Sequence, residues 1–121
     1  MKKIEAIIQE ERLNAVKKSL EEKGFIGLTV TNVSGRGQQR GISLQWRVGE
    51  YRVDLLPKIK VEVVVSDKDC QTVIEIILEF GRTGNIGDGM IFVLPVEQIY
   101  RVRTGQSGES VFTQNSGQQL E

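Results

Sequence analysis

The chain has 121 residues, of which 39% are hydrophobic and 26% are charged, and its sixteen basic side chains balance sixteen acidic ones. This composition is typical of one globular domain and argues against a disordered chain. The balanced charge provides no general attraction to nucleic acid or anionic lipid, so any anion site must be local. With no histidine and a single cysteine, Cys70, the chain has no means to form an internal disulfide, a typical zinc site or an imidazole catalyst.

The sequence shows no sign of membrane insertion or export. No apolar run approaches the roughly 18 residues of a membrane-spanning helix. The opening segment MKKIEAIIQEE places acidic residues too early for a signal peptide. We therefore expect a cytoplasmic protein that meets a membrane only through a partner.

The first third of the chain predicts a strand, a helix and a second strand. Residues 3–8 alternate between apolar and polar side chains, as a half-buried strand does. An apolar stripe over residues 13–20 has helical spacing, and Gly24 is placed to end that helix as a left-handed cap. Residues 28–33 are rich in β-branched side chains and alternate again, which predicts the second strand.

Residues 37–54 show no sustained period and predict a long loop. Loops longer than about 12–15 residues are uncommon inside a compact domain and are usually functional or disordered. Trp46 and Tyr51 in this loop are either partial packing anchors or contact points for another molecule. Exposed aromatic side chains on a loop favour the second interpretation.

The second half of the chain repeats the strand and helix pattern. Residues 58–65 predict an alternating strand, with Lys58 on the face opposite Ile59, Val61, Val63 and Val65. Ser66 and Asp69 have the spacing of a capping box, with both side chains expected to bond helix amides at the start of a second helix. A glycine-rich turn, residues 83–89, ends that helix.

Two extended segments and a tail complete the chain. Met90–Leu94 predicts a short buried strand that stops at Pro95. Ile99–Arg103 reads as another extended segment with Arg101 and Arg103 on one face. The Gly, Ser and Gln content from Thr104 onward predicts a flexible tail.

The order β-α-β, loop, β-α-β predicts an α+β fold of the ferredoxin-like type, with an antiparallel sheet and both helices on one face. The opposite face of the sheet also carries alternating apolar residues. We therefore expect a homo-oligomer that covers this face with copies of the chain.

Three features suggest a site for a phosphate-bearing ligand. Four glycines between Gly81 and Gly89 let backbone amides approach an anion closely, although such a turn can also simply end a helix. Lys58 and the pair Arg101 and Arg103 can bind the same anion, or they can be ordinary solvated surface residues. The common phosphate-binding fingerprints are absent. Cys70 has no neighbouring base and reads as structural, and no set of residues forms a convincing catalytic centre, so we expect no enzyme.

Five segments together resemble the PII signal-transduction proteins: MKKIEAII, GLTVTNVSGRG, EYRVDLLPKIKVEVVV, TGNIGDG and RVRTG. The resemblance extends from residue 1 to about residue 108. It implies a homotrimer of ferredoxin-like domains (1–108), in which residues 37–54 form the partner-binding T-loop, followed by a flexible tail at 109–121.

The resemblance also implies a non-enzymatic sensor of nitrogen and energy status. ATP or ADP would bind in clefts between subunits, and ATP with Mg²⁺ would support 2-oxoglutarate, with Gln39 on the metal and Gln39 and Lys58 near the oxoacid. One subunit would contribute Gly35, Gly37, Gln38, Gln39, Lys58, Ile86, Gly87, Asp88, Gly89 and Met90. The neighbouring subunit would contribute Thr29, Glu62, Val64, Arg101 and Arg103.

Partner regulation is implied through the loop. Arg47 matches the residue that enters the pore of an ammonium channel in some members, and nitrogen-metabolism enzymes are other possible partners. Tyr51 matches a tyrosine that is uridylylated in some bacterial members, whereas Gly49 removes a serine that is phosphorylated in others. Direct nucleic acid binding is not implied.

Two departures bear on ligand preference. Gln38 and Met90 stand where basic residues are usual in the family, so two positive charges near the phosphates are missing. Charge-assisted bonds are worth about 1.5–3 kcal/mol each, so ATP affinity and the preference for ATP over ADP should fall. The alternative to a nitrogen sensor is a divergent PII-like paralogue that binds adenine nucleotides but responds to another small molecule. Slow ATP hydrolysis is a third reading, but no residue is placed as its base.

Overall fold

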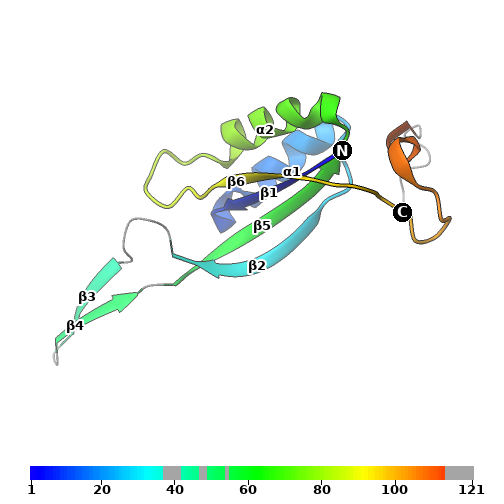
Figure 1. The fold of residues 1–121 in the computed structure, drawn as a ribbon. Helices are drawn as coiled ribbons and strands as arrows, with labels where there is room; N and C mark the ends of the chain where they lie inside the picture. Colours follow the sequence, from blue (N-terminus) through cyan, green and yellow to red (C-terminus); the bar gives the residue numbers. More distant parts are fainter. Residues whose placement is uncertain (37–41, 47–48, 54, 114–121) are drawn as a thin grey trace.

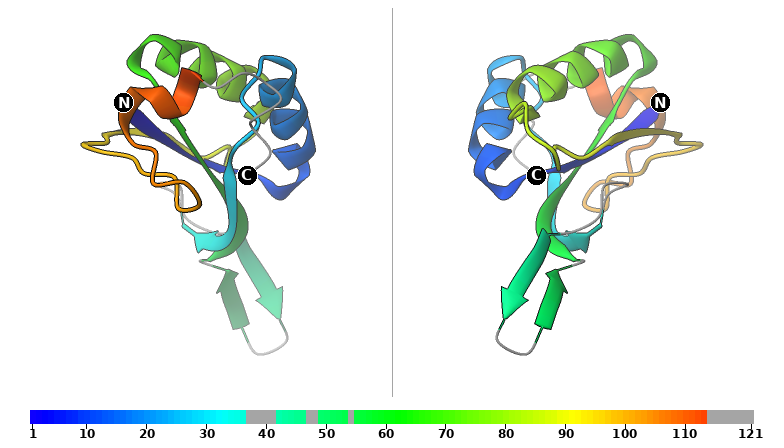
Figure 2. Two further views of the ribbon diagram at one scale, coloured as in Figure 1. Left: turned by 90° about the vertical axis from the view of Figure 1, so that its right-hand side faces the viewer. Right: turned by 90° about the vertical axis from the view of Figure 1, so that its left-hand side faces the viewer.

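The computed structural model describes residues 1–36, 42–46, 49–53 and 55–113. Its main body is a four-stranded antiparallel sheet with two α-helices packed on one face, as Figures 1 and 2 show. The strands of this sheet are β1 (Lys2–Ile8), β2 (Thr29–Gly35), β5 (Leu56–Val65) and β6 (Ile91–Pro95). The helices are α1 (Leu13–Glu22) and α2 (Asp67–Gly81), with short 3-10 helices η1 (Glu10–Arg12) and η2 (Gly108–Thr113). The strand order β2-β5-β1-β6 confirms the predicted ferredoxin-like fold.

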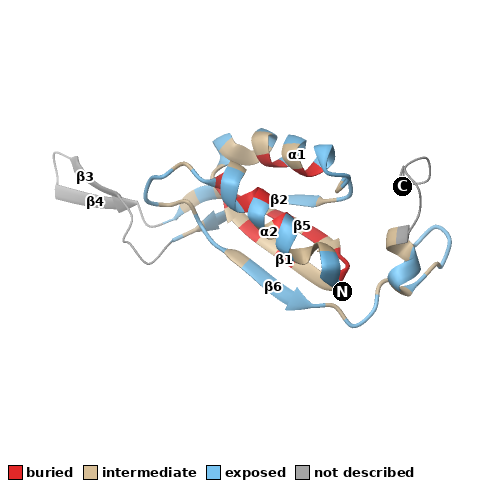
Figure 3. Cartoon of the chain, turned by 90° about the horizontal axis from the view of Figure 1, so that it is seen from above, coloured by how far each residue is buried: buried red, intermediate tan, exposed pale blue. Residues whose placement is uncertain are grey.

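The core lies between the two central strands and the helices. The register places Ile4 of β1 opposite Val63 of β5, and their buried side chains join one apolar cluster with Leu20 of α1 and Ile77 of α2. Figure 3 shows this buried layer on the helices and the central strands. The alternation in β1 and β5 therefore separates a core face from a face that no helix covers. None of the helices in the described ranges is long and apolar enough to span a membrane.

The ends of the helices test two predictions. Gly24 has φ +91° and donates its N–H to the Glu21 carbonyl at 2.9 Å, while Phe25 donates to the Leu20 carbonyl at 2.9 Å. These are the two bonds of a Schellman motif, so the predicted glycine cap is confirmed. Ser66 stands at the N-cap of α2, but its hydroxyl donates to the Asp69 carboxylate at 3.2 Å and makes no bond to a helix amide. The predicted capping box is therefore wrong, because the hydroxyl takes a charged acceptor instead.

The expected long loop contains a hairpin. Residues Ile42–Trp46 (β3) and Gly49–Val53 (β4) pair in antiparallel register and form a separate two-stranded sheet that projects from the main body in Figure 1. The prediction of irregular structure is wrong for these ten positions. Apolar and polar residue types do alternate in both segments, but each run is only five residues long, and the glycines at positions 41 and 49 hid the period.

Strand β6 is an edge strand, and its predicted burial is wrong for the single chain. The structure pairs β6 with β1 alone, and the side chains of Phe92 and Val93 are 47% and 45% exposed. Figure 3 shows most of this strand as exposed. A continuous apolar run at an open edge marks a surface for another chain, which agrees with the expected homo-oligomer.

The segment after β6 turns sharply instead of extending. Gly105 donates its N–H to the Arg101 carbonyl at 2.8 Å, and Tyr100 forms an isolated bridge with Ser107. Because the chain turns here, the argument from strand alternation that put Arg101 and Arg103 on one face does not hold. Helix η2 and the turn before it replace part of the expected flexible tail, and residues 114–121 lie outside the described residues.

Candidate functional site

The glycine-rich turn and Lys58 face one another across a cleft of about 710 Å³, the first cleft. β1, β5 and the end of β2 form its floor, and the turn forms its wall. It brings together seven of the predicted site residues with four others. Its lining comprises Ile7, Gly35, Arg36, Lys58, Asn85, Ile86, Gly87, Asp88, Gly89, Met90 and Phe92.

The turn requires glycine at defined positions. Gly87 and Gly89 have φ of +99° and +92°, in the left-handed region that side chains with a Cβ rarely adopt. At Gly89 the restriction is also one of space, because a Cβ would lie 1.8 Å from the carbonyl oxygen of Ile7. The Ile7 amide in turn donates to the Met90 carbonyl at 2.8 Å. Gly89 therefore allows the turn to lie directly against β1.

Asp88 holds the turn together from inside. Its Oδ2 accepts hydrogen bonds from the amides of Thr83 at 3.0 Å and Gly84 at 2.9 Å, and its Oδ1 accepts from the Thr83 hydroxyl and from Gln9 Nε2. The Thr83 hydroxyl is the main cause of a lowered pKa for Asp88, with the two amides and Gln9 adding to it against partial desolvation. The carboxylate is thus used to organise the turn rather than directed at a ligand.

We expect Asp88→Asn to destabilise the fold by about 2 kcal/mol near neutral pH, because several bonds to a charged acceptor are weakened or lost. A folded-state pKa below the unfolded value means that this contribution is present above the unfolded pKa and is lost as pH falls through the folded pKa. The gap between wild type and variant should therefore stay constant above about pH 5 and close below about pH 4. Urea unfolding at a series of pH values measures this difference in the free energy of unfolding. A difference that widens in acid would contradict the lowered pKa of Asp88.

Lys58 and backbone amides supply the positive side of the first cleft. Lys58 Nζ donates to the Gly87 carbonyl at 2.5 Å, so the ammonium lies beside the turn. Among the described residues, no acceptor is found for the amides of Ile86, Gly87 and Gly89. Amides without an acceptor beside an ammonium are donors that the oxygens of a phosphate group can use. The structure thus brings Lys58 and the glycine turn together.

The remaining described site residues lie at the other end of the sheet. Thr29, Glu62, Val64 and Arg101 line a second cleft of about 510 Å³, together with residues of the segment before β2 and with Val111 and Phe112 of η2. Figure 1 shows η2 at the end of the sheet opposite the hairpin. Arg103 lines neither cleft. The described site residues therefore line two separate clefts rather than one.

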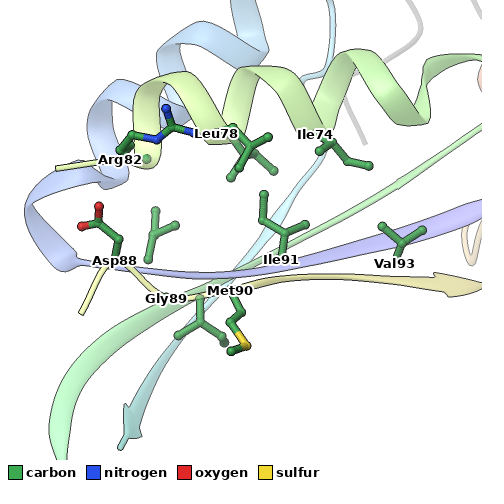
Figure 4. Close-up of a pocket in the computed structure, with 12 residues that line it drawn as sticks. Ile74, Leu78, Arg82, Asp88, Gly89, Met90, Ile91 and Val93 are labelled. Atoms are coloured by element: carbon green, nitrogen blue, oxygen red, sulfur yellow. The ribbon is translucent and has the colours of Figure 1, made fainter. Parts of the chain in front are cut away.

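A third hollow lies between α2 and β6 on the other side of the turn. Figure 4 shows its apolar walls, with Ile74 and Leu78 from α2 facing Ile91 and Val93, and with Asp88 at the end near Arg82. Its volume is about 500 Å³. Its lining is mostly hydrocarbon, so it is not suited to a polyanion.

Two groups of residues in this region are not predicted from the sequence. Arg36 lines the first cleft. Because it follows Gly35 directly, a predicted site residue, its position in the sequence could have indicated that it belongs to the site. Gln9 and Thr83 support Asp88, but the contact between Gln9 and Asp88 joins residues 79 positions apart, which no local pattern indicates.

Several predicted residues lie outside the described residues. These are Gly37, Gln38, Gln39 and Arg47, so the expected metal ligand Gln39 has no position here. Tyr51 lies on β4, opposite Leu44 of β3. In the described ranges, no three His, Cys, Asp or Glu residues lie close enough together to hold a metal ion.

Comparison with known proteins agrees with this fold and these segments. The sequence pattern of the family described as "Nitrogen regulatory protein P-II" matches residues 1–106. Nitrogen regulatory protein P-II 2 of Methanothermobacter thermautotrophicus is 52% identical over 109 residues, covering 90% of this chain and 95% of that protein. Nitrogen regulatory protein P-II of Rhizobium meliloti is 52% identical over 108 residues, covering 89% and 96%. With half of its residues shared over nearly its whole length, the chain belongs to the nitrogen regulatory protein P-II family.

Proposed function

We propose that this protein is a non-enzymatic, cytoplasmic sensor that binds ATP or ADP between the subunits of a homotrimer. The observation that supports the proposal is that the expected nucleotide-binding residues line two separate clefts at opposite ends of one sheet. Lys58 and Glu62 are four residues apart on β5, which corresponds to about 13 Å between their backbones. A ring of copies brings the second cleft of one subunit against the first cleft of the next and completes the site.

The first cleft fits the phosphate end of the nucleotide. The amides of residues 86, 87 and 89, with Lys58 and Arg36, offer donors to phosphate oxygens, and Ile7 and Phe92 offer apolar surface beside them. Gln39 would hold Mg²⁺, which supplies positive charge that offsets the phosphates when it is bound. Lys58 would contact a 2-oxoglutarate carboxylate at the same end.

We infer that the loop 37–54 carries the signal to partners. The loop connects the end of β2 to the start of β5, and both of these strand ends line the first cleft, through Gly35 and Lys58. A ligand there acts on the segment whose Arg47 and Tyr51 are the expected contact and modification sites. The names of the relatives point to nitrogen regulation, so nitrogen-metabolism enzymes or an ammonium channel are the partners we propose.

Two measurements test this function. Light scattering should give a mass about three times the 13.6 kDa of one chain. Calorimetry should show micromolar binding of ATP and of ADP with similar affinities at equal Mg²⁺, followed by 2-oxoglutarate binding to the protein saturated with Mg-ATP. A monomer that binds no adenine nucleotide would overturn the proposal.

One observation favours a second candidate, a divergent paralogue with another effector. Met90 lines the first cleft with its side chain 52% exposed, so the missing cation leaves an apolar group beside the turn. Nucleotide binding without any response to 2-oxoglutarate would select this candidate.

A further inference from the structure

The uncovered face of the sheet carries a charged cluster that the proposed function does not explain. Lys3 Nζ on β1 lies 2.5 Å from Glu62 Oε2 on β5 and 3.3 Å from Glu5 Oε2 on its own strand. In the register, Glu5 stands directly opposite Glu62. Two carboxylates in this arrangement repel one another, and the single ammonium between them removes that repulsion.

The surroundings of Glu62 show that Lys3 is its main partner. The Lys3 ammonium lowers the pKa of Glu62, and Lys60 on β5 contributes less in the same direction. On the flanking strands, β2 places the neutral Thr29 opposite Glu62, and β6 places Phe92 opposite Glu5. Further charges, those of Asp69 and Arg101, line the second cleft with Lys3 and Glu62.

We propose that Lys3 is a positioning residue for Glu62, holding that carboxylate ionised and directed into the second cleft, where it accepts a hydrogen bond from the nucleotide of the adjoining subunit. The inference rests on the proposed function, since it needs a nucleotide between subunits. Its physical basis is that Lys3 both offsets the charge of Glu5 and limits the rotamers of Glu62. An acceptor fixed in this way loses little conformational freedom when a ligand arrives.

The test is the ratio of ATP dissociation constants for Lys3→Met and wild type, measured by calorimetry at two pH values. We expect the variant to bind about fivefold more weakly at about pH 8, within the range for a half-exposed ion pair. At about pH 5 the ratio should rise further, because the two adjacent carboxylates, left without the ammonium between them, take up a shared proton as a pair. Protonation of ATP itself affects both proteins equally and cancels from the ratio. A purely structural role would give the same ratio at both pH values.

Two control variants accompany the test. Lys3→Arg keeps the cation between the glutamates, so its ATP affinity should stay within about twofold of wild type at both pH values. Lys2→Met removes the same charge from the preceding residue of β1, whose side chain is on the helix face. This substitution should not change the affinity for ATP. Light scattering must show that each variant keeps the oligomeric state of the wild type.

Glu5→Gln provides an independent check if Lys3→Met does not assemble. With Glu5 neutral, Lys3 serves Glu62 alone, so ATP affinity should be unchanged or tighter, and weaker binding would overturn the role of Lys3. A Lys3→Met ratio near one, or one that is independent of pH, would overturn the role of Lys3 while leaving the proposed function intact. Failure of the wild type to bind ATP would overturn both.

Discussion

Replacing Gly89 by alanine should destabilise the protein by about 3 kcal/mol or more and abolish nucleotide binding. The new Cβ would lie 1.8 Å from the Ile7 carbonyl oxygen and 2.8 Å from its carbon, so the turn must move away from β1. That movement separates the turn from β1, and the shape of the first cleft depends on their close contact. The two Ile7 atoms that the new Cβ would meet both belong to the backbone, so no change of rotamer can relieve the clash.

Gly84→Ala is the matched control for this substitution. Gly84 has φ +88°, close to the value at Gly89, but a Cβ there meets nothing within 4 Å. It should therefore cost only the conformational strain of about 1–2 kcal/mol and keep most of the ATP affinity. Urea unfolding at a fixed protomer concentration, with calorimetry on each variant, separates the two effects. Equal losses for both variants would show that strain alone, and not contact with β1, matters at Gly89.

Lys58→Met should lower ATP affinity by about 10- to 100-fold and remove the 2-oxoglutarate response, because one charge-assisted contact to each ligand is lost. Its cost to the fold should be about 1–3 kcal/mol for the lost bond to the Gly87 carbonyl, since the methionine keeps the aliphatic part of the side chain beside Gly35. The measurement is calorimetry with ATP, and then with 2-oxoglutarate in the presence of saturating Mg-ATP.

Lys60→Met controls for the loss of a charge from the same strand. Lys60 lies two residues further along β5 on the same face, but it lines neither of the two clefts. Its substitution should leave ATP affinity within about threefold of wild type, the scale of an exposed charge. If Lys58→Met and Lys60→Met weakened ATP binding equally, Lys58 would act through long-range electrostatic attraction and not through a direct contact with the nucleotide at the turn.

The sequence predicted the parts of this fold that rest on a long, regular period. β1, β5 and α2 each repeat their pattern over seven residues or more, and all three form where expected. The glycine turn and Lys58 were also recognised as a pair, because both residue types have a clear use with anions.

The errors have a different physical origin. The β3 and β4 strands are five residues each, too short for their alternation to stand out among glycines. The extended reading of 99–103 failed because backbone bonds from Gly105 to Arg101 close a turn that the alternating arginines do not reveal. The exposure of β6 depends on its place at the edge of the sheet, which is a property of the topology. The support of Asp88 by Gln9 likewise depends on tertiary structure.

The internal bonding of the glycine turn has a kinetic consequence. Asp88 and Thr83 already hold the segment in one conformation without a ligand, so its ordering entropy is lost during folding rather than during binding. Encounter with this rigid wall needs no slow rearrangement of the turn. Ligands that use it should therefore associate at similar rates, and their affinities should differ mainly through how quickly they leave.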